Sequence, residues 1–317
     1  MNIRKQVLKS VYTLIRNDKK HISYLLYYTI LEGILAMSIP LASSFIINSI
    51  LAHATISIMV VAFLVIIIVL LTTFLHVVKE YIIEKLQQKI FIDTAANIAI
   101  MANTMKGDAH SSTTDKYMNY FFDITAIQKL FPILLLDGSS LLVKLIVSLV
   151  LFLIFDGILF AMGIFFLLLF IIIIILLGRN GADYAIERSD AKHKTIYYLQ
   201  SIPEIKENKQ NILSTFDALL DEFMSTRERI FKVIIRQLAF TYFMEGLIFG
   251  TFLIAGGFMV INGTLPIGEF IAMEIAVVYL TYALRSFMKH IDYIYDVIEG
   301  VYKVDKLSSH LKKATNE

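Results

Sequence analysis

The sequence predicts an all-α polytopic membrane protein: six transmembrane helices with long cytoplasmic helical extensions. Hydrophobic residues make up 57% of the 317-residue chain, and its mean hydropathy of +0.69 is far above that of a globular domain. Residues 131–177 contain only three charged side chains, those of Asp137, Lys144 and Asp156. Lysine and arginine are absent from three short connections between apolar stretches, which is the third sign of a membrane protein.

Residues 131–177 predict a helical hairpin in the membrane. A membrane-spanning helix needs about 20 apolar residues, so this run accommodates two. Backbone groups in lipid must be satisfied within their own segment, and the unbroken Ile and Leu runs lack the alternation of barrel strands. Asp156-Gly157 is the natural turn, which gives helices over 131–155 and 158–177.

Four further spans follow from the remaining apolar stretches, at residues 21–51, 57–76, 238–261 and 269–284. Residues 1–20 are basic and mildly amphipathic, which predicts an interfacial helix on the anionic cytoplasmic surface. The apolar stretch that follows is too long for the core of a signal peptide, so we expect a span there.

Two long cytoplasmic arms interrupt this domain of residues 21–290, near 77–130 and 178–237. The helical pattern of the second span continues past His76 to about residue 105, so that its outer part reaches roughly 40 Å. A polar loop at 107–114 follows, with Thr113 or Thr114 as the cap of a short helix. The second arm contains two charged helices with a kink at Ser201-Ile-Pro. Residues 291–317 form a charged cytoplasmic tail.

The distribution of basic residues sets the expected orientation. Of the 29 lysines and arginines, every one except Lys144 is assigned to the N-terminal segment, the two arms or the C-terminal part after the sixth span. The positive-inside rule then places both termini and both arms in the cytoplasm, with the protein in the cytoplasmic (inner) membrane.

This outline resembles the transmembrane domain of ABC exporters (the type I exporter, or type IV, fold). Residues 257–272, Gly-Phe-Met-Val-Ile-Asn-Gly-Thr-Leu-Pro-Ile-Gly-Glu-Phe-Ile-Ala, look like the family signature between spans five and six. Residues 198–206, Tyr-Leu-Gln-Ser-Ile-Pro-Glu-Ile-Lys, are similar to a stretch in its second arm, and Pro40 stands where the family has a proline. The first arm departs from the family, because Thr114, Asp115 and Asn119 stand where a glycine and an arginine are usual.

The resemblance implies a permease subunit that dimerises, with itself or with another six-span chain. The chain has no G-x-x-x-x-G-K-[ST] loop and no LSGGQ-like motif, so we do not expect an enzyme or a cofactor on it. ATP and Mg²⁺ are expected on a separate ATPase subunit. Two alternatives stay open: an ATPase-free, proton-coupled peptide transporter resembling SbmA/BacA, and a non-transporting accessory protein on the same scaffold.

Charged residues inside the spans are candidates for the substrate path, because such charges are costly and usually face a cavity or a partner. We predict that Lys144, near the bilayer centre, faces the cavity with Glu32 or Glu245 as its partner. The alternatives are structural pairing between helices and a lysine that faces lipid and snorkels outward. His76 is expected at the interface, and Tyr242 is an additional aromatic candidate for the path. The remaining candidates are Glu274, Tyr279 and Tyr282.

The tips of the arms are the expected contacts with the ATPase, since aromatic side chains far from lipid need a partner surface. The alternative is that the arms pack on themselves. The chain has no cysteine and no HExxH motif, so we predict no metal site. We also expect no nucleic-acid partner. The sequence does not identify the substrate. The candidate coupling residues are Tyr117, Met118, Tyr120, Phe121, Ile202, Ile205 and Lys206.

Overall fold

The computed structural model describes residues 19–104, 132–206, 208–300 and 302. Every regular element in these residues is helical, and six helices are long and apolar enough to cross a membrane. The prediction of an all-helical chain with six helices able to span a membrane is therefore confirmed. The elements are α2 (Lys19–Leu51), α3 (Thr55–Thr104), a π-helical turn η1 (Pro132–Gly138), α5 (Ser139–Phe155), α6 (Gly157–Leu177), α7 (Gly181–Ser201), a 3-10 turn η2 (Ile202–Glu204), α8 (Lys209–Ile261) and α9 (Ile267–Lys289).

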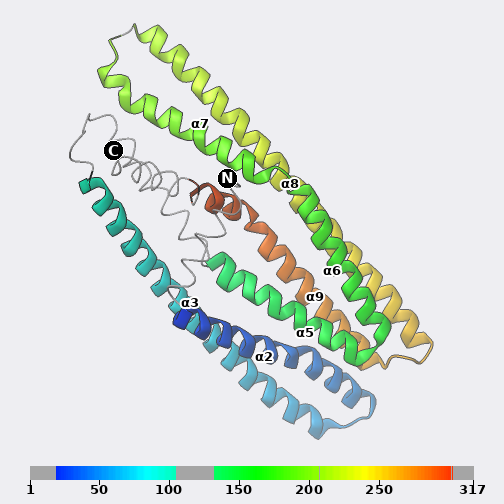
Figure 1. The fold of residues 1–317 in the computed structure, drawn as a ribbon. Coiled ribbons are helices and arrows are strands. Elements are labelled where there is room, and N and C mark those ends of the chain that lie inside the picture. Colours follow the sequence, from blue (N-terminus) through cyan, green and yellow to red (C-terminus); the bar gives the residue numbers. More distant parts are fainter. Residues whose placement is uncertain (1–18, 105–131, 207, 301, 303–317) are drawn as a thin grey trace.

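The helices form two groups joined by a central helix, α9 (Figure 1). Helices α2 and α3 pack together on one side, while α6 and α7 run along α8 on the other. Helix α9 contacts α2, α5 and α8, so it ties the two groups together. The connections at residues 52–54, 156 and 262–266 lie at one end of the bundle, which we call the loop end; the opposite end is the arm end.

The apolar hairpin predicted from residues 131–177 is present as α5 and α6. Asp156 is the only residue between them, and its carboxylate accepts a hydrogen bond from the Ile158 amide at 2.6 Å, which caps α6. The hairpin packs on α8 through aromatic side chains. The ring centroids of Phe152 and Phe252 are 4.8 Å apart, and both side chains are fully buried.

Two helices are much longer than a bilayer requires, as the sequence predicted. Helix α3 has 50 residues and α8 has 53, whereas about 20 residues span the hydrocarbon. Their surplus length, together with α7, forms the extensions at the arm end. The predicted kink near Pro203 is also present. The short turn η2 follows the last residue of α7 and separates α7 from α8.

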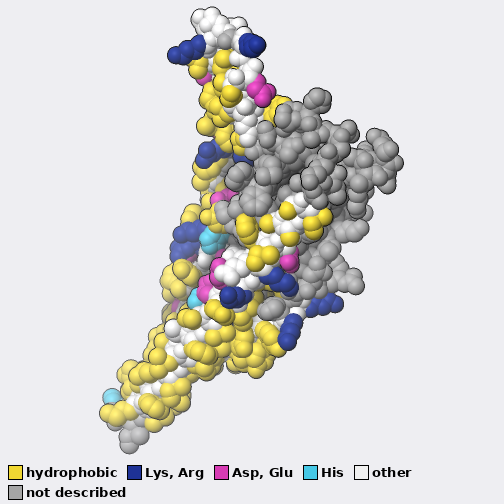
Figure 2. Space-filling model, turned by 90° about the vertical axis from the view of Figure 1, so that its left-hand side faces the viewer, with side chains coloured by type: hydrophobic (Ala, Val, Ile, Leu, Met, Phe, Trp, Pro, Cys, Tyr) yellow, Lys and Arg dark blue, Asp and Glu magenta, His cyan; other side chains and the backbone are white. Residues whose placement is uncertain are grey.

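Apolar and charged side chains on the surface are also unevenly distributed along the molecule. In Figure 2 the lower end of the molecule is covered by hydrophobic side chains, whereas lysine, arginine and acidic side chains appear only in the middle and at the top. The apolar parts of α3 and α6 expose hydrophobic residues on most of their circumference. Phe63, Leu70 and Ile175 are examples, each at least 65% exposed. Such a surface is stable only in lipid or against another apolar chain.

A polar joint connects the α7–α8 arm to the helical residues 291–300. Tyr295 is buried, and its hydroxyl donates to the Gln237 side chain at 3.1 Å, while the Gln237 amide donates to the Ile174 carbonyl at 3.2 Å. The first residue of α7 is Gly181, where a Cβ would lie 2.5 Å from the Tyr295 hydroxyl. Glycine therefore makes room for the tyrosine ring at this crossing.

Ion pairs extend this joint along α7. Arg188 donates to Asp296 at 2.6 Å and to Glu299 at 2.8 Å, and Lys192 lies 3.0 Å from Glu299. Because Glu299 is 5% exposed, two cations are needed to offset the cost of burying its charge. These ion pairs thus hold the helical residues 291–300 against α7.

Candidate functional site

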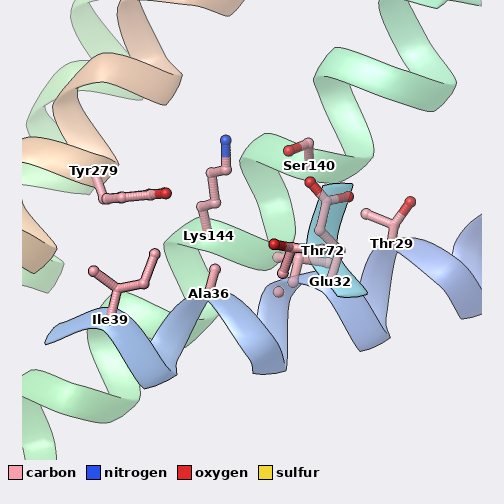
Figure 3. A pocket seen from close by; sticks show the side chains of 10 residues that line it. Thr29, Glu32, Ala36, Ile39, Thr72, Ser140, Lys144 and Tyr279 are labelled. Carbon is pink, nitrogen blue, oxygen red and sulfur yellow. The ribbon is translucent and has the colours of Figure 1, made fainter. Parts of the chain in front are cut away.

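A polar cavity of about 90 Å³ lies inside the bundle, between α2, α3, α5 and α9 (Figure 3). It is large enough for a few water molecules. Gly33 of α2 forms part of its wall, and a Cβ at that position would overlap Val143 of α5, so the glycine allows these two helices to approach closely. The lining residues are Thr29, Glu32, Gly33, Ala36, Ile39, Thr72, Ser140, Val143, Lys144 and Tyr279.

Lys144 lines this cavity, and its place on a substrate path stays a prediction. It lies about 18 Å along α5 from the loop-end residue Asp156, and Tyr279 lies at a similar depth on α9. The Lys144 ammonium is 5.6 Å from the centroid of the Tyr279 ring, which is within the range of a cation–π interaction. Figure 3 shows the lysine standing between Tyr279 and Glu32.

Glu32 shares the cavity with Lys144 but forms its ion pair with Lys79 of α3. Lys79 is fully buried, Glu32 is 17% exposed, and the His76 imidazole lies 3.6 Å from the second oxygen of Glu32. A buried carboxylate and a buried ammonium stabilise each other because neither keeps its water. The prediction gave Lys144 either Glu32 or Glu245 as its partner, in direct contact or through water; in the structure the direct ion pair of Glu32 is with Lys79.

Glu245 has a different partner as well. Its oxygens lie 3.0 and 3.2 Å from Arg285 of α9, and that guanidinium stacks on the Tyr282 ring at 5.4 Å. The predicted sixth span ends at residue 284, just before Arg285, but α9 continues to Lys289, and Arg285 lies only about 27 Å from the start of that helix. This corrects the end of the sixth span and makes Glu245–Arg285 a pair linking α8 to α9.

Glu274, the fourth predicted charge, lies on α9, one and a half turns nearer the loop end than Tyr279. Within the described part of the chain, neither of its buried oxygens has a hydrogen-bond partner. Burying a carboxylate without a partner costs free energy, so we expect Glu274 to bind a proton, a water molecule or a group from another chain.

The three tyrosines that the sequence singled out occupy different surroundings. Tyr279 lines the cavity, Tyr282 lies against Arg285, and Tyr242 on α8 is 48% exposed and takes no part in either arrangement. The cavity thus brings together Lys144, Glu32 and Tyr279, but not Glu245, Glu274 or Tyr282.

The predicted coupling residues of the first arm, Tyr117, Met118, Tyr120 and Phe121, lie outside the described residues. Those of the second arm lie at its tip. Ile202 begins η2, Ile205 follows it, and Lys206 is exposed, which leaves a compact turn between α7 and α8. Nearby apolar side chains are also exposed, with Leu199 at 46% and Leu213 at 50%.

Sequence reasoning missed two charged residues of these clusters, Lys79 and Arg285. Lys79 was read as part of a solvated arm because it follows the apolar run and precedes a charged stretch. Its spacing from His76 and Glu80 places all three on adjoining faces of one helix, but only the packing of α2 shows which face is buried.

Comparison of the sequence with protein-family models and with curated proteins found no match. In the described residues, no group of three or more histidine and acidic side chains is arranged to hold a metal ion.

Proposed function

We propose that this chain is the membrane-spanning permease subunit of an ABC-type exporter, driven by an ATPase on a separate chain. The observation that carries the proposal is the combination of six spans with two helices, α3 and α8, that continue far beyond the bilayer. A helix of 53 residues is about 80 Å long, more than twice the hydrocarbon thickness. Rigid arms of this length suit the transfer of motion between the membrane and a soluble motor.

In this proposal the cavity around Lys144 is part of the translocation path of a dimer. Among the described residues, the ammonium has a tyrosine ring but no carboxylate in direct contact, since Glu32 is paired with Lys79. A cation at mid-membrane that is not neutralised by its neighbours attracts anionic groups. We infer a preference for amphipathic cargo that carries a carboxylate or another negative charge.

A proton-coupled transporter is the second candidate, and Glu274 favours it. A buried carboxylate without a partner in the described residues is a suitable proton carrier, because it exchanges a proton without breaking an ion pair. The two candidates differ in the energy source, so the dependence of transport on ATP or on the proton gradient distinguishes them.

The exporter proposal requires the arm end to face the cytoplasm, where ATP is. The chain has no native cysteine, so single cysteines report accessibility cleanly. Cysteines at Gly157 and Thr264, both exposed at the loop end, should react with an impermeant thiol reagent in intact cells. A cysteine at Asn208, exposed at the tip of the second arm, should react only after permeabilisation. Its labelling in permeabilised cells is the control that this cysteine is reactive. Labelling of Asn208→Cys in intact cells would reject the orientation and with it the proposal.

A further inference from the structure

A basic groove on the arm carries an inference that does not depend on transport. Helices α7 and α8 run side by side at the arm end (Figure 1), and an open groove of about 360 Å³ lies between them. It is lined by Tyr184 of α7 and by Arg229, Lys232, Ile235 and Arg236 of α8. Three of the five lining residues are thus cationic.

The Arg236 end of the groove lies near the depth of lipid head groups, and the groove extends from there to Arg229, about 48 Å along α8 from Ile261. Arg236 is about 38 Å along α8 from the loop-end residue Ile261, which is just beyond a hydrocarbon core of about 30 Å. Side chains of a helix tilt toward its N-terminus, which for α8 is the arm end, so Arg236 is directed away from the hydrocarbon. Its Nε donates to the carbonyl of Lys232 at 3.0 Å, which holds the guanidinium beside the groove.

The charges of the groove are not fully neutralised. Arg229 lies 2.9 Å from Glu187 and Lys232 lies 2.8 Å from Glu228, but Arg236 has no carboxylate partner within the described part of the chain. Both ion pairs are about half-exposed or more, and such surface pairs contribute little free energy. Their cations therefore remain able to bind another anion.

The uncharged residues of the groove match the other parts of a lipid. Ile235 is 46% exposed, and Tyr242, two turns nearer the bilayer on the same face of α8, is 48% exposed, so a largely apolar surface continues from the groove toward the bilayer. The Arg229 guanidinium lies over the Tyr184 ring, 5.9 Å from its centroid, and one of its nitrogens faces Glu187 at 2.9 Å. A guanidinium carries five N–H donors, so donors remain for phosphate oxygens. Tyrosine is also a preferred residue at the membrane interface.

We propose that this groove binds the phosphate of an anionic phospholipid in the leaflet at the arm end. Basic pockets between helices at this level recognise anionic head groups, and the arginines provide the paired donors that phosphate prefers. The lipid would hold α7 against α8 where the two helices leave the bilayer.

The test uses the full chain, purified in detergent and freed of lipid, with dioleoylphosphatidylglycerol as the probe and native mass spectrometry as the readout. We expect tighter binding than for dioleoylphosphatidylcholine, and a roughly twentyfold weaker affinity in the Arg229→Gln/Arg236→Gln variant. Arg227→Gln/Lys209→Gln is the matched control, since it removes two exposed positive charges of α8 outside the groove. Its affinity should stay within about twofold of wild type, since only contacts in the groove are proposed to matter.

Three results would overturn the inference: an unchanged affinity of the groove variant, an equal loss in the control, or displacement of the lipid by glycerol 1-phosphate. The last result would assign the groove to a soluble phosphate. Because the substitutions are exposed, the unfolding temperature of the lipid-free variant should equal that of wild type. Binding is measured without ATP, so this test is independent of the exporter proposal.

Discussion

Replacing Lys79 with methionine is expected to destabilise the protein by about 3–5 kcal/mol, the largest effect of any single substitution considered. The ammonium is fully buried and pairs with Glu32, which is 17% exposed. Its removal leaves a buried carboxylate with no ammonium in direct contact among the described residues, although the His76 imidazole lies 3.6 Å away and Lys144 lines the same cavity. The measurement is the fraction of monodisperse protein that remains after heating in detergent.

The double variant Glu32→Gln/Lys79→Met is the control for this prediction. Replacing both charges removes the uncompensated carboxylate, so most of the lost stability should return. Lys85→Met, at an exposed position two turns further along α3, should have little effect. A Lys79→Met variant as stable as wild type, or a double variant no better than the single one, would show that the pair is not buried in the membrane-embedded protein.

Replacing Lys144 with methionine should lower the transport of anionic cargo about tenfold or more while leaving expression and folding near wild type. One lost charge contact of about 1.4 kcal/mol already accounts for a factor of ten. In the part of the chain that the structure describes, Lys144 has no direct carboxylate partner, and Glu32 keeps its ion pair with Lys79 when Lys144 is replaced. The assay is ATP-driven uptake of a panel of fluorescent amphipathic anions and cations into inverted membrane vesicles.

The matched control is Tyr282→Phe, which keeps the ring beside Arg285 and lies outside the cavity. Its transport should be unchanged. Uptake of anions at the wild-type rate by Lys144→Met would refute the role of the cavity in cargo selection. A loss of folded protein would instead make Lys144 a structural residue, the alternative that the sequence left open.

The fold was predictable where local physics decides it. The unbroken apolar run of residues 131–177 allows only a buried helical hairpin, and the structure places its turn at Asp156. The long helices α3 and α8 were likewise predictable, because no glycine or proline stands at the junction where the helical pattern of each passes between apolar and charged sequence. The exporter-like assembly itself stays a prediction, since it depends on chains that the sequence does not contain.

The candidate site was only partly predictable. The cost of an isolated charge indicated Lys144, Glu32 and Glu245, but their partners depend on which helix faces which. Lys79 pairs with Glu32 because α3 packs along α2, and Arg285 reaches Glu245 because α9 continues past the apolar stretch. The joint of Tyr295, Gln237 and Gly181 involves three segments far apart in sequence, and no pattern in any one of them indicates it.

The central claim, that a separate ATPase drives this chain through the arm tips, is tested most directly by purifying the tagged chain from its native membranes in mild detergent. The account predicts a second polypeptide in fixed ratio that carries a G-x-x-x-x-G-K-[ST] loop, and a complex that hydrolyses ATP. The Ile202→Asp/Ile205→Asp variant should lose both, because buried apolar anchors at an interface cost about 2 kcal/mol or more each. Met224→Asp, at an exposed apolar position in the middle of α8, should lose neither. A wild-type chain that purifies without such a polypeptide, and whose uptake in vesicles follows the proton gradient rather than ATP, would contradict the account.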